Sequence, residues 1–87
     1  MNYKYQGLET HLSSRPSTTN EITLSFGEIE TIIGDSLPSS AFNYREWWAN
    51  QSDTSNRPQA KAWVSAGFVV DEVHQEQLNS WVRFKRL

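Results

Sequence analysis

The spacing of apolar residues predicts two short helices in the first half of the chain. Tyr5, Leu8 and Leu12 recur at intervals of three and four residues, which places them on one side of a helix over residues 5–14. The tetrapeptide 25–28 fits a capping box, in which a serine and a glutamate each bind a free backbone amide at a helix start. A second helix therefore begins near residue 26, ends at Gly34 and buries a stripe made up of Phe26, Ile29, Ile32 and Ile33.

A third helix is predicted over residues 57–66. Pro58 is tolerated in a first helical turn, and Asn56 or a neighbour can cap it. The buried side is marked by Ala60, Trp63, Val64 and Gly67. We therefore expect an open side that carries Gln59, Lys61 and Ser65.

Alternating apolar and polar residues predict three strands. Residues 22–26 form a short, half-buried one. Residues 68–73 and 80–86 are also strand-like, and the polar segment 74–79 between them indicates a β-hairpin. In the last strand Val82 and Phe84 share one face, and the opposite face carries Trp81, Arg83 and Lys85.

The middle of the chain has less regular patterning. Residues 37–42 resemble a helix start with a serine cap and too little periodicity to continue beyond about two turns. Residues 43–50 fit either a bent strand or an aromatic loop, and residues 50–57 form a polar loop. The adjacent Trp47 and Trp48 can share one small core only if the backbone bends, because neighbouring side chains diverge in both helices and strands.

The order of these elements indicates an α+β fold. Three to four short helices, a short strand and a C-terminal hairpin match a winged helix, here a single domain over residues 1–87. On this mapping residues 57–66 are the recognition helix and residues 67–87 the wing. The connection that holds the tryptophan pair is much longer than a DNA-reading turn, which weakens the case for DNA binding more than the case for the fold.

Composition narrows the class of protein. Since the 87 residues include no cysteine, disulfides and thiolate metal sites are excluded. No apolar run approaches the roughly 18 residues that span a membrane, and the N-terminus lacks a secretory signal, so we expect a cytoplasmic protein without membrane contact. The net charge of −2 disfavours a strong, nonspecific hold on nucleic acid, although Arg83, Lys85 and Arg86 cluster at the C-terminal end.

Residues along nearly the whole chain carry a resemblance to a known family. They are Lys4, Tyr5, Leu8, Leu24–Phe26, Glu28–Glu30, Ile33, Gly34, Leu37, Pro38, Ser40, Ala41, Tyr44, Trp47–Asn50, Gln59, Ala60, Ala62, Trp63, Ala66, Gly67, Val82 and Phe84. In these positions the chain resembles a family of small, uncharacterised bacterial and phage-associated domains with a WW-x-N motif. The resemblance implies a winged-helix-like fold and supplies no activity.

The sequence offers little for catalysis. Neither His11 nor His74 has the close His, Asp or Glu spacing of a metal site, and no nucleophile motif is present. Glu28 and Glu30 are two residues apart on a helix and do not face each other. We therefore expect a non-catalytic binding domain with no cofactor and no metal.

Two kinds of partner fit this expectation. The first is nucleic acid, most simply DNA, bound by the domain directly or in a regulatory accessory role. Cations would contact phosphate, polar residues of the recognition helix would reach base edges, and a tryptophan would stack or wedge. The residues are Arg57, Gln59, Lys61, Ser65, Trp81, Arg83, Lys85 and Arg86.

The second is a protein partner or self-association through the tryptophan pair. Tryptophan and arginine are frequent in interaction hot spots, so the predicted surface is Arg45, Trp47, Trp48 and Asn50. A structural alternative stays open, in which both rings pack in the core and Asn50 caps or ties the following loop.

Overall fold

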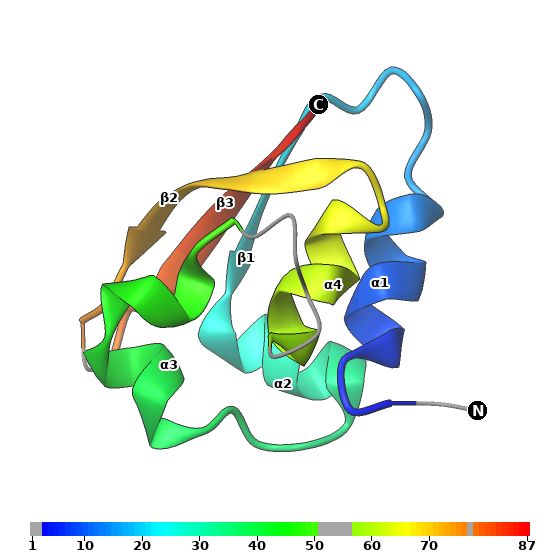
Figure 1. Cartoon of the computed structure of the whole chain (residues 1–87). Coiled ribbons are helices and arrows are strands. Elements are labelled where there is room, and N and C mark those ends of the chain that lie inside the picture. The colour runs from blue at the N-terminus through cyan, green and yellow to red at the C-terminus, as the bar shows by residue number, and fades with distance from the viewer. Residues whose placement is uncertain (1–2, 51–56, 77) are drawn as a thin grey trace.

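The fold combines α-helices with a three-stranded antiparallel sheet, which confirms the α+β class (Figure 1). The computed structural model describes residues 3–50, 57–76 and 78–87. Within these residues the helices are α1 (Gln6–Ser13), α2 (Phe26–Ile33), α3 (Ser39–Asn43) and α4 (Pro58–Val64), and one turn of 3₁₀ helix, η1 (Arg45–Trp48), follows α3. The strands are β1 (Glu21–Ser25), β2 (Phe68–His74) and β3 (Trp81–Arg86).

The ends of α2 follow from its own sequence. The Ser25 hydroxyl accepts a hydrogen bond from the amide of Glu28 at 3.0 Å, and the Glu28 carboxylate accepts one from the amide of Ser25 at 2.8 Å. This reciprocal capping box confirms the predicted start of the helix. Gly34 ends the helix with a φ of 71°, a left-handed conformation that favours glycine, as predicted.

The other two predicted helices lie where expected, with shorter ends. α1 covers eight of the residues predicted for the first helix, and Leu8 and Leu12 are buried. α4 starts at Pro58, and Arg57 occupies its N-cap position without a capping side-chain bond. The proposed cap Asn56 lies outside the described residues.

The predicted hairpin is confirmed, and it forms a sheet with β1. The strand order is β1-β3-β2, so β3 pairs with both neighbours and β1 and β2 are the edges. β1 pairs antiparallel with β3, with Ile22 opposite Phe84 and Leu24 opposite Val82. Figure 1 shows α1, α2 and α4 grouped on one side of this sheet. Together the element order and the strand order are compatible with a winged helix.

A line of four aromatic rings forms the centre of the core. Phe26 of α2 contacts Trp48 of η1 with ring centroids 5.0 Å apart, and Trp48 stacks on Trp63 of α4 at 5.7 Å. Trp63 in turn lies 5.6 Å from Phe84 of β3. Since all four side chains are buried, the rings join three helical elements to the inner face of the sheet.

Two expectations for the middle of the chain were wrong. The helix α3 has Pro38 at its N-cap and no capping side-chain bond, so no serine caps it. Residues 45–48 form neither a bent strand nor an open loop but the 3₁₀ turn η1. This tight turn supplies the backbone bend that the adjacent tryptophans need, because it brings the rings of Trp47 and Trp48 to 4.6 Å in an edge-to-face arrangement.

Candidate binding surfaces

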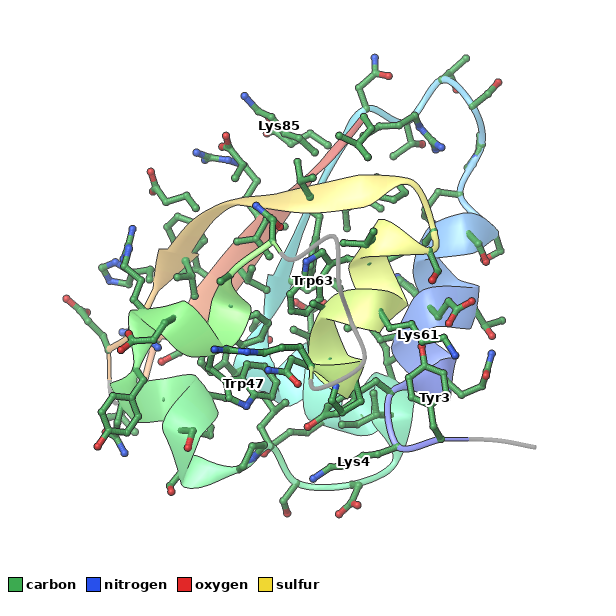
Figure 2. All side chains as sticks on the ribbon, viewed as in Figure 1. Tyr3, Lys4, Trp47, Lys61, Trp63 and Lys85 are labelled. Carbon is green, nitrogen blue, oxygen red and sulfur yellow. The ribbon has the colours of Figure 1, made fainter. Side chains whose placement is uncertain are left out.

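The residues predicted to contact nucleic acid fall on two different sides of the molecule. α4 packs on the inner face of the sheet, where Trp63 meets Phe84. Because side chains alternate along a strand, Arg83 and Lys85 project from the outer face of β3. Figure 2 shows Lys61 beside α1 and Lys85 projecting from the sheet away from the helices. The eight residues therefore do not form one continuous surface.

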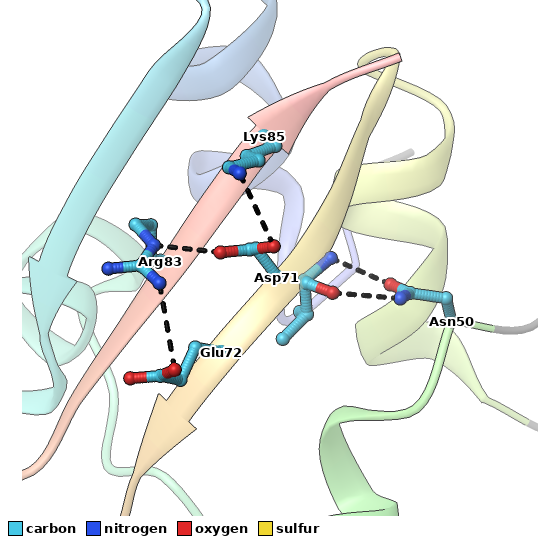
Figure 3. Close-up of polar contacts among 6 residues, drawn as sticks. Asn50, Asp71, Glu72, Arg83 and Lys85 are labelled. Carbon is cyan, nitrogen blue, oxygen red and sulfur yellow. Dashed lines mark hydrogen bonds and ion pairs between the residues drawn. The ribbon is translucent and has the colours of Figure 1, made fainter.

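Carboxylates neutralise the cations on the outer face of the sheet (Figure 3). Arg83 donates to Asp71 at 2.8 Å and lies 3.6 Å from Glu72, and Lys85 lies 3.6 Å from Asp71. An irregularity in the strand register between Val70 and Glu72 lets both carboxylates reach Arg83. The hydrogen bond from Arg83 holds the pKa of Asp71 below its usual value. These two cations therefore face two anions from the neighbouring strand.

Arg86 has an internal role. Its guanidinium donates to the carbonyls of Thr19 and Pro16, each at 2.9 Å, and lies over the ring of Phe68 at 4.7 Å. These contacts fasten the connection between α1 and β1 to the C-terminal strand. Phosphate contact by Arg86 would compete with all of them.

Trp81 belongs to a small stack on the outer face. Its ring lies 5.4 Å from that of His74 at an interplanar angle of 16°, and the Arg83 guanidinium lies 5.8 Å from its centroid. The ring is half-buried, so one part of its surface stays in solvent. Of the four predicted contacts on β3, Trp81 is the one with apolar surface available to a partner.

On α4 the expectation for Gln59 was wrong. The side chain is 6% exposed, and its amide donates to the carbonyl of Trp47 at 3.1 Å. The physical reason is the long connection, because η1 packs against the start of α4 and covers this position. Lys61 and Ser65 are exposed as predicted, with the Lys61 ammonium 4.8 Å from the ring of Tyr3. Arg57 is half-buried and donates to the carbonyl of Glu46 at 2.8 Å.

The tryptophan pair is divided between core and surface. Trp48 is 2% exposed, and its indole N–H donates to the carbonyl of Ala41 at 2.9 Å. Trp47 is half-buried and meets Tyr5 edge-to-face at 5.9 Å. The ring of Trp48 is thus inaccessible to a partner, which removes it from the predicted interaction surface.

Asn50 and Arg45 bind the backbone of β2. The Asn50 side chain donates to the carbonyl of Val70 at 2.9 Å and accepts from its amide at 2.7 Å, as Figure 3 shows. The same oxygen accepts from the indole N–H of Trp63 at 3.1 Å. Arg45 donates to the carbonyl of Val73 at 3.1 Å. Asn50 therefore has the tying role of the structural alternative, whereas the half-buried Trp47 does not fit its expectation that both rings lie in the core.

One exposed apolar surface was missed by the sequence reasoning. Leu78, in the turn between β2 and β3, is 93% exposed. It lines an open groove with a volume of about 390 Å³, together with Phe26, Phe42 and Trp81. We call this the turn groove; its remaining lining residues are Ser25, Gly27, Glu30, Asn79 and Ser80. The available signal was a leucine inside an otherwise polar turn, three residues before β3 begins with Trp81.

The described residues offer neither a metal site nor a membrane-spanning helix. Among them, no group of three or more His, Cys, Asp or Glu side chains could hold a metal ion. The helices within the same part of the chain are all too short or too polar to cross a membrane.

Comparison with known proteins gives a family. Residues 5–86 match the family described as Domain of unknown function (DUF7662). No curated protein and no solved structure matches the chain. Because the match covers every helix and strand from α1 to β3, the chain belongs to this family, a domain of unknown function.

Proposed function

We propose that this chain is a non-catalytic protein-binding domain whose contact surface is the turn groove. The observation that carries the proposal is Leu78, which is 93% exposed next to the half-buried rings of Phe42 and Trp81. Single exposed leucines are common, but one that continues an apolar groove is typical of a contact surface. A tryptophan at its border adds the residue type that hot spots favour.

The charge of the turn also favours a protein partner over nucleic acid. Residues 74–80 carry one glutamate and no lysine or arginine. A wing that grips a phosphate backbone needs cations, because phosphate neutralisation supplies most of the nonspecific affinity. The cations nearest along β3, Arg83 and Lys85, are paired with Asp71 and Glu72.

A peptide selection tests the proposal directly. The purified domain is used to select from a displayed random peptide library, and the enriched peptides are titrated against variants. Leu78→Asp should abolish binding, because it places a charge in the apolar groove. Leu87→Asp is the matched control, since Leu87 is 79% exposed at the opposite end of β3.

Two outcomes would overturn the proposal. One is the failure of any peptide to enrich against the folded wild-type domain. The other is equal binding by wild type and Leu78→Asp, with near-ultraviolet circular dichroism showing that both are folded.

A second candidate function is nucleic-acid binding through α4. The observation in its favour is the element order with the strand order β1-β3-β2, which is compatible with a winged helix whose recognition helix is α4. Arg57 and the exposed Lys61 and Ser65 would be its contacts. This support is an analogy of fold, and a fold does not fix a function.

Fluorescence anisotropy with labelled duplex and single-stranded DNA separates the two candidates. Phosphate contact predicts binding at low salt that weakens as salt rises. Arg57→Ala with Lys61→Ala should reduce it, whereas Arg83→Ala with Lys85→Ala should not. Absence of binding at low salt would exclude this candidate.

The proposal includes a cytoplasmic location, which the sequence favours, and a bacterial or phage origin, which only the family resemblance implies. Genomic neighbourhood is the inexpensive check. A gene beside a nuclease, a repressor or a phage module would favour the nucleic-acid candidate.

A further inference from the structure

We infer that the turn groove accepts an apolar segment of a partner protein whose neighbouring residues are lysine or arginine. This inference rests on the proposed function, and it adds the chemistry of the partner. It follows from the aromatic base of the groove, the charges around it and the absence of cations among its described lining residues.

The base of the groove is aromatic and fixed. Phe26 is 2% exposed and packs edge-to-face on Phe42 with ring centroids 5.1 Å apart. Phe26 is also the first of the four aromatic rings in the core and contacts Trp48, so it cannot move without disturbing the core. Trp81 forms one wall through its stack on His74. A rigid apolar base of this kind suits an inserted aliphatic or aromatic side chain, because little ordering is lost on binding.

A second hollow continues the groove along the turn. It is lined by Phe42 and Ser80, which both hollows share, and by Asn43, Gln75 and Glu76. The amide of Gln75 donates to the carbonyls of Ala41 and Tyr44, so the turn is fastened to α3 along this line. The two hollows together offer room for a short segment rather than for a single side chain.

Carboxylates surround this path. Glu30 lines the groove, and its Oε2 accepts from the amide of Leu37 at 2.8 Å. Glu28 follows the lining residue Gly27 and is exposed, and Glu76 lines the second hollow. Within the described part of the chain, none of these three glutamates pairs with a lysine or arginine, and the one ion-pair contact among them is between Glu76 and the His74 imidazole, 3.3 Å away.

The lining residues themselves contain no lysine or arginine. A partner with cations beside its apolar residues would therefore meet attraction on both sides of the groove, and an acidic partner would meet repulsion. Charge complementarity of this kind sets the choice of partner more than the total affinity. The inferred ligand is accordingly an amphipathic, basic segment.

Two synthetic peptides of equal length form the probe. They share the same leucine and phenylalanine positions, and their polar positions are all lysine in one and all glutamate in the other. Isothermal titration with the wild-type domain should give about tenfold tighter binding of the lysine peptide at low salt. The difference should shrink at high salt, because these charges are exposed.

Matched charge variants locate the effect. Glu28→Gln with Glu76→Gln should reduce the preference to about threefold. Gln at residue 28 still completes the capping box, so the helix start is preserved. The control is Glu21→Gln with Glu46→Gln, which removes the same charge from exposed positions that neither line the groove nor adjoin a lining residue.

The outcomes separate this inference from the proposed function. If neither peptide binds, the inference is overturned, and the peptide selection decides the proposed function separately. If both bind equally through Leu78, only the inference is overturned, and the same holds if the control pair lowers the preference as much as the groove pair. Analytical sedimentation tests whether a second copy of the chain occupies the groove instead. A wild-type dimer that Leu78→Asp converts to a monomer would show this and overturn the inference.

Discussion

Asn50 is an exposed residue whose side chain joins three parts of the fold. Its amide group satisfies the backbone N–H and C=O of Val70 on β2 and the indole N–H of Trp63 on α4, and its own backbone continues from η1. Exposure alone therefore understates its importance. Asn50 stabilises the fold mainly by accepting a hydrogen bond from the buried indole N–H of Trp63, since leaving that N–H unpaired would cost free energy.

We predict that Asn50→Ala lowers the free energy of unfolding by about 2–3 kcal/mol, because it removes three hydrogen bonds and leaves the Trp63 N–H without its acceptor. Urea denaturation followed by tryptophan fluorescence measures the loss. Asn50→Asp keeps the acceptor and loses only the donor, so its destabilisation should be smaller. Equal destabilisation by both substitutions would contradict the role given to the acceptor.

His11 on α1 should make stability depend on pH. Burial is the main cause that lowers its pKa below 6.5, with the charge of Arg15 second, while Glu28 acts in the opposite direction. The folded state therefore prefers the neutral imidazole, and the unfolded chain takes up a proton first as pH falls. Stability from this group is present above about pH 6.5 and is lost as pH falls through the folded pKa.

The measurement is urea denaturation at about pH 7.5 and about pH 5.5 for wild type and His11→Gln. We predict that the free energy of unfolding falls more for the wild type than for the variant when the pH is lowered from the higher to the lower value. The same loss in both proteins would assign the pH dependence to other groups.

At the scale of the elements, local signals predicted more than distant ones. The capping box and Gly34 define α2 through residues that touch each other within the helix, so the sequence sufficed. Gln59 is buried because its side chain binds the carbonyl of Trp47, twelve residues away. The sequence around Gln59 gives no indication of this contact. The 3₁₀ turn η1 was missed for a related reason. The adjacent tryptophans indicated a bend in the backbone, but the kind of turn depends on how both rings pack against distant residues.

Helix packing gives a prediction at this scale. A Cβ on Gly7 would lie 2.5 Å from the carbonyl oxygen of Ile32, because α1 and α2 pack closely there. Gly7→Ala should therefore destabilise the domain by about 1–3 kcal/mol.

Gly27→Ala is the matched control on α2. Its Cβ would have only the Ser25 hydroxyl nearby, at 3.9 Å, and alanine favours a helix over glycine by up to about 1 kcal/mol. Thermal denaturation should thus move in opposite directions for the two alanines. A loss of stability in both would mean that the close approach of α1 and α2 is not the cause.

At the scale of the whole molecule, the arrangement of charge changed the picture most. The sequence indicates a basic cluster at the C-terminal end, but the hairpin brings Asp71 and Glu72 beside two of its cations, Arg83 and Lys85. This pairing follows from strand register, which the sequence predicts only roughly, and the position of β1 beside β3 was not anticipated at all. The turn groove has the same origin, since its walls come from α2, α3 and the hairpin.

The line of aromatic rings makes the tryptophan pair unequal. Trp48→Ala removes a buried ring between Phe26 and Trp63, and we predict a loss of about 3–5 kcal/mol, which is enough to unfold much of a small domain. Trp47→Ala removes a half-buried ring and should cost about 1–2 kcal/mol. Chemical denaturation compares them, and equal losses would contradict this division.

The bonds from Asn50 to Val70 have a further consequence for the molecule in a crowded solution. β2 is an edge strand, and an edge with free N–H and C=O groups can recruit strands from other chains. Here one of its outward-facing backbone pairs is already occupied by a side chain of the same chain, and Arg45 occupies a carbonyl further along. The segment that the sequence offered as an interaction surface thus occupies part of the β2 edge, which leaves fewer free N–H and C=O groups there for a strand of another chain.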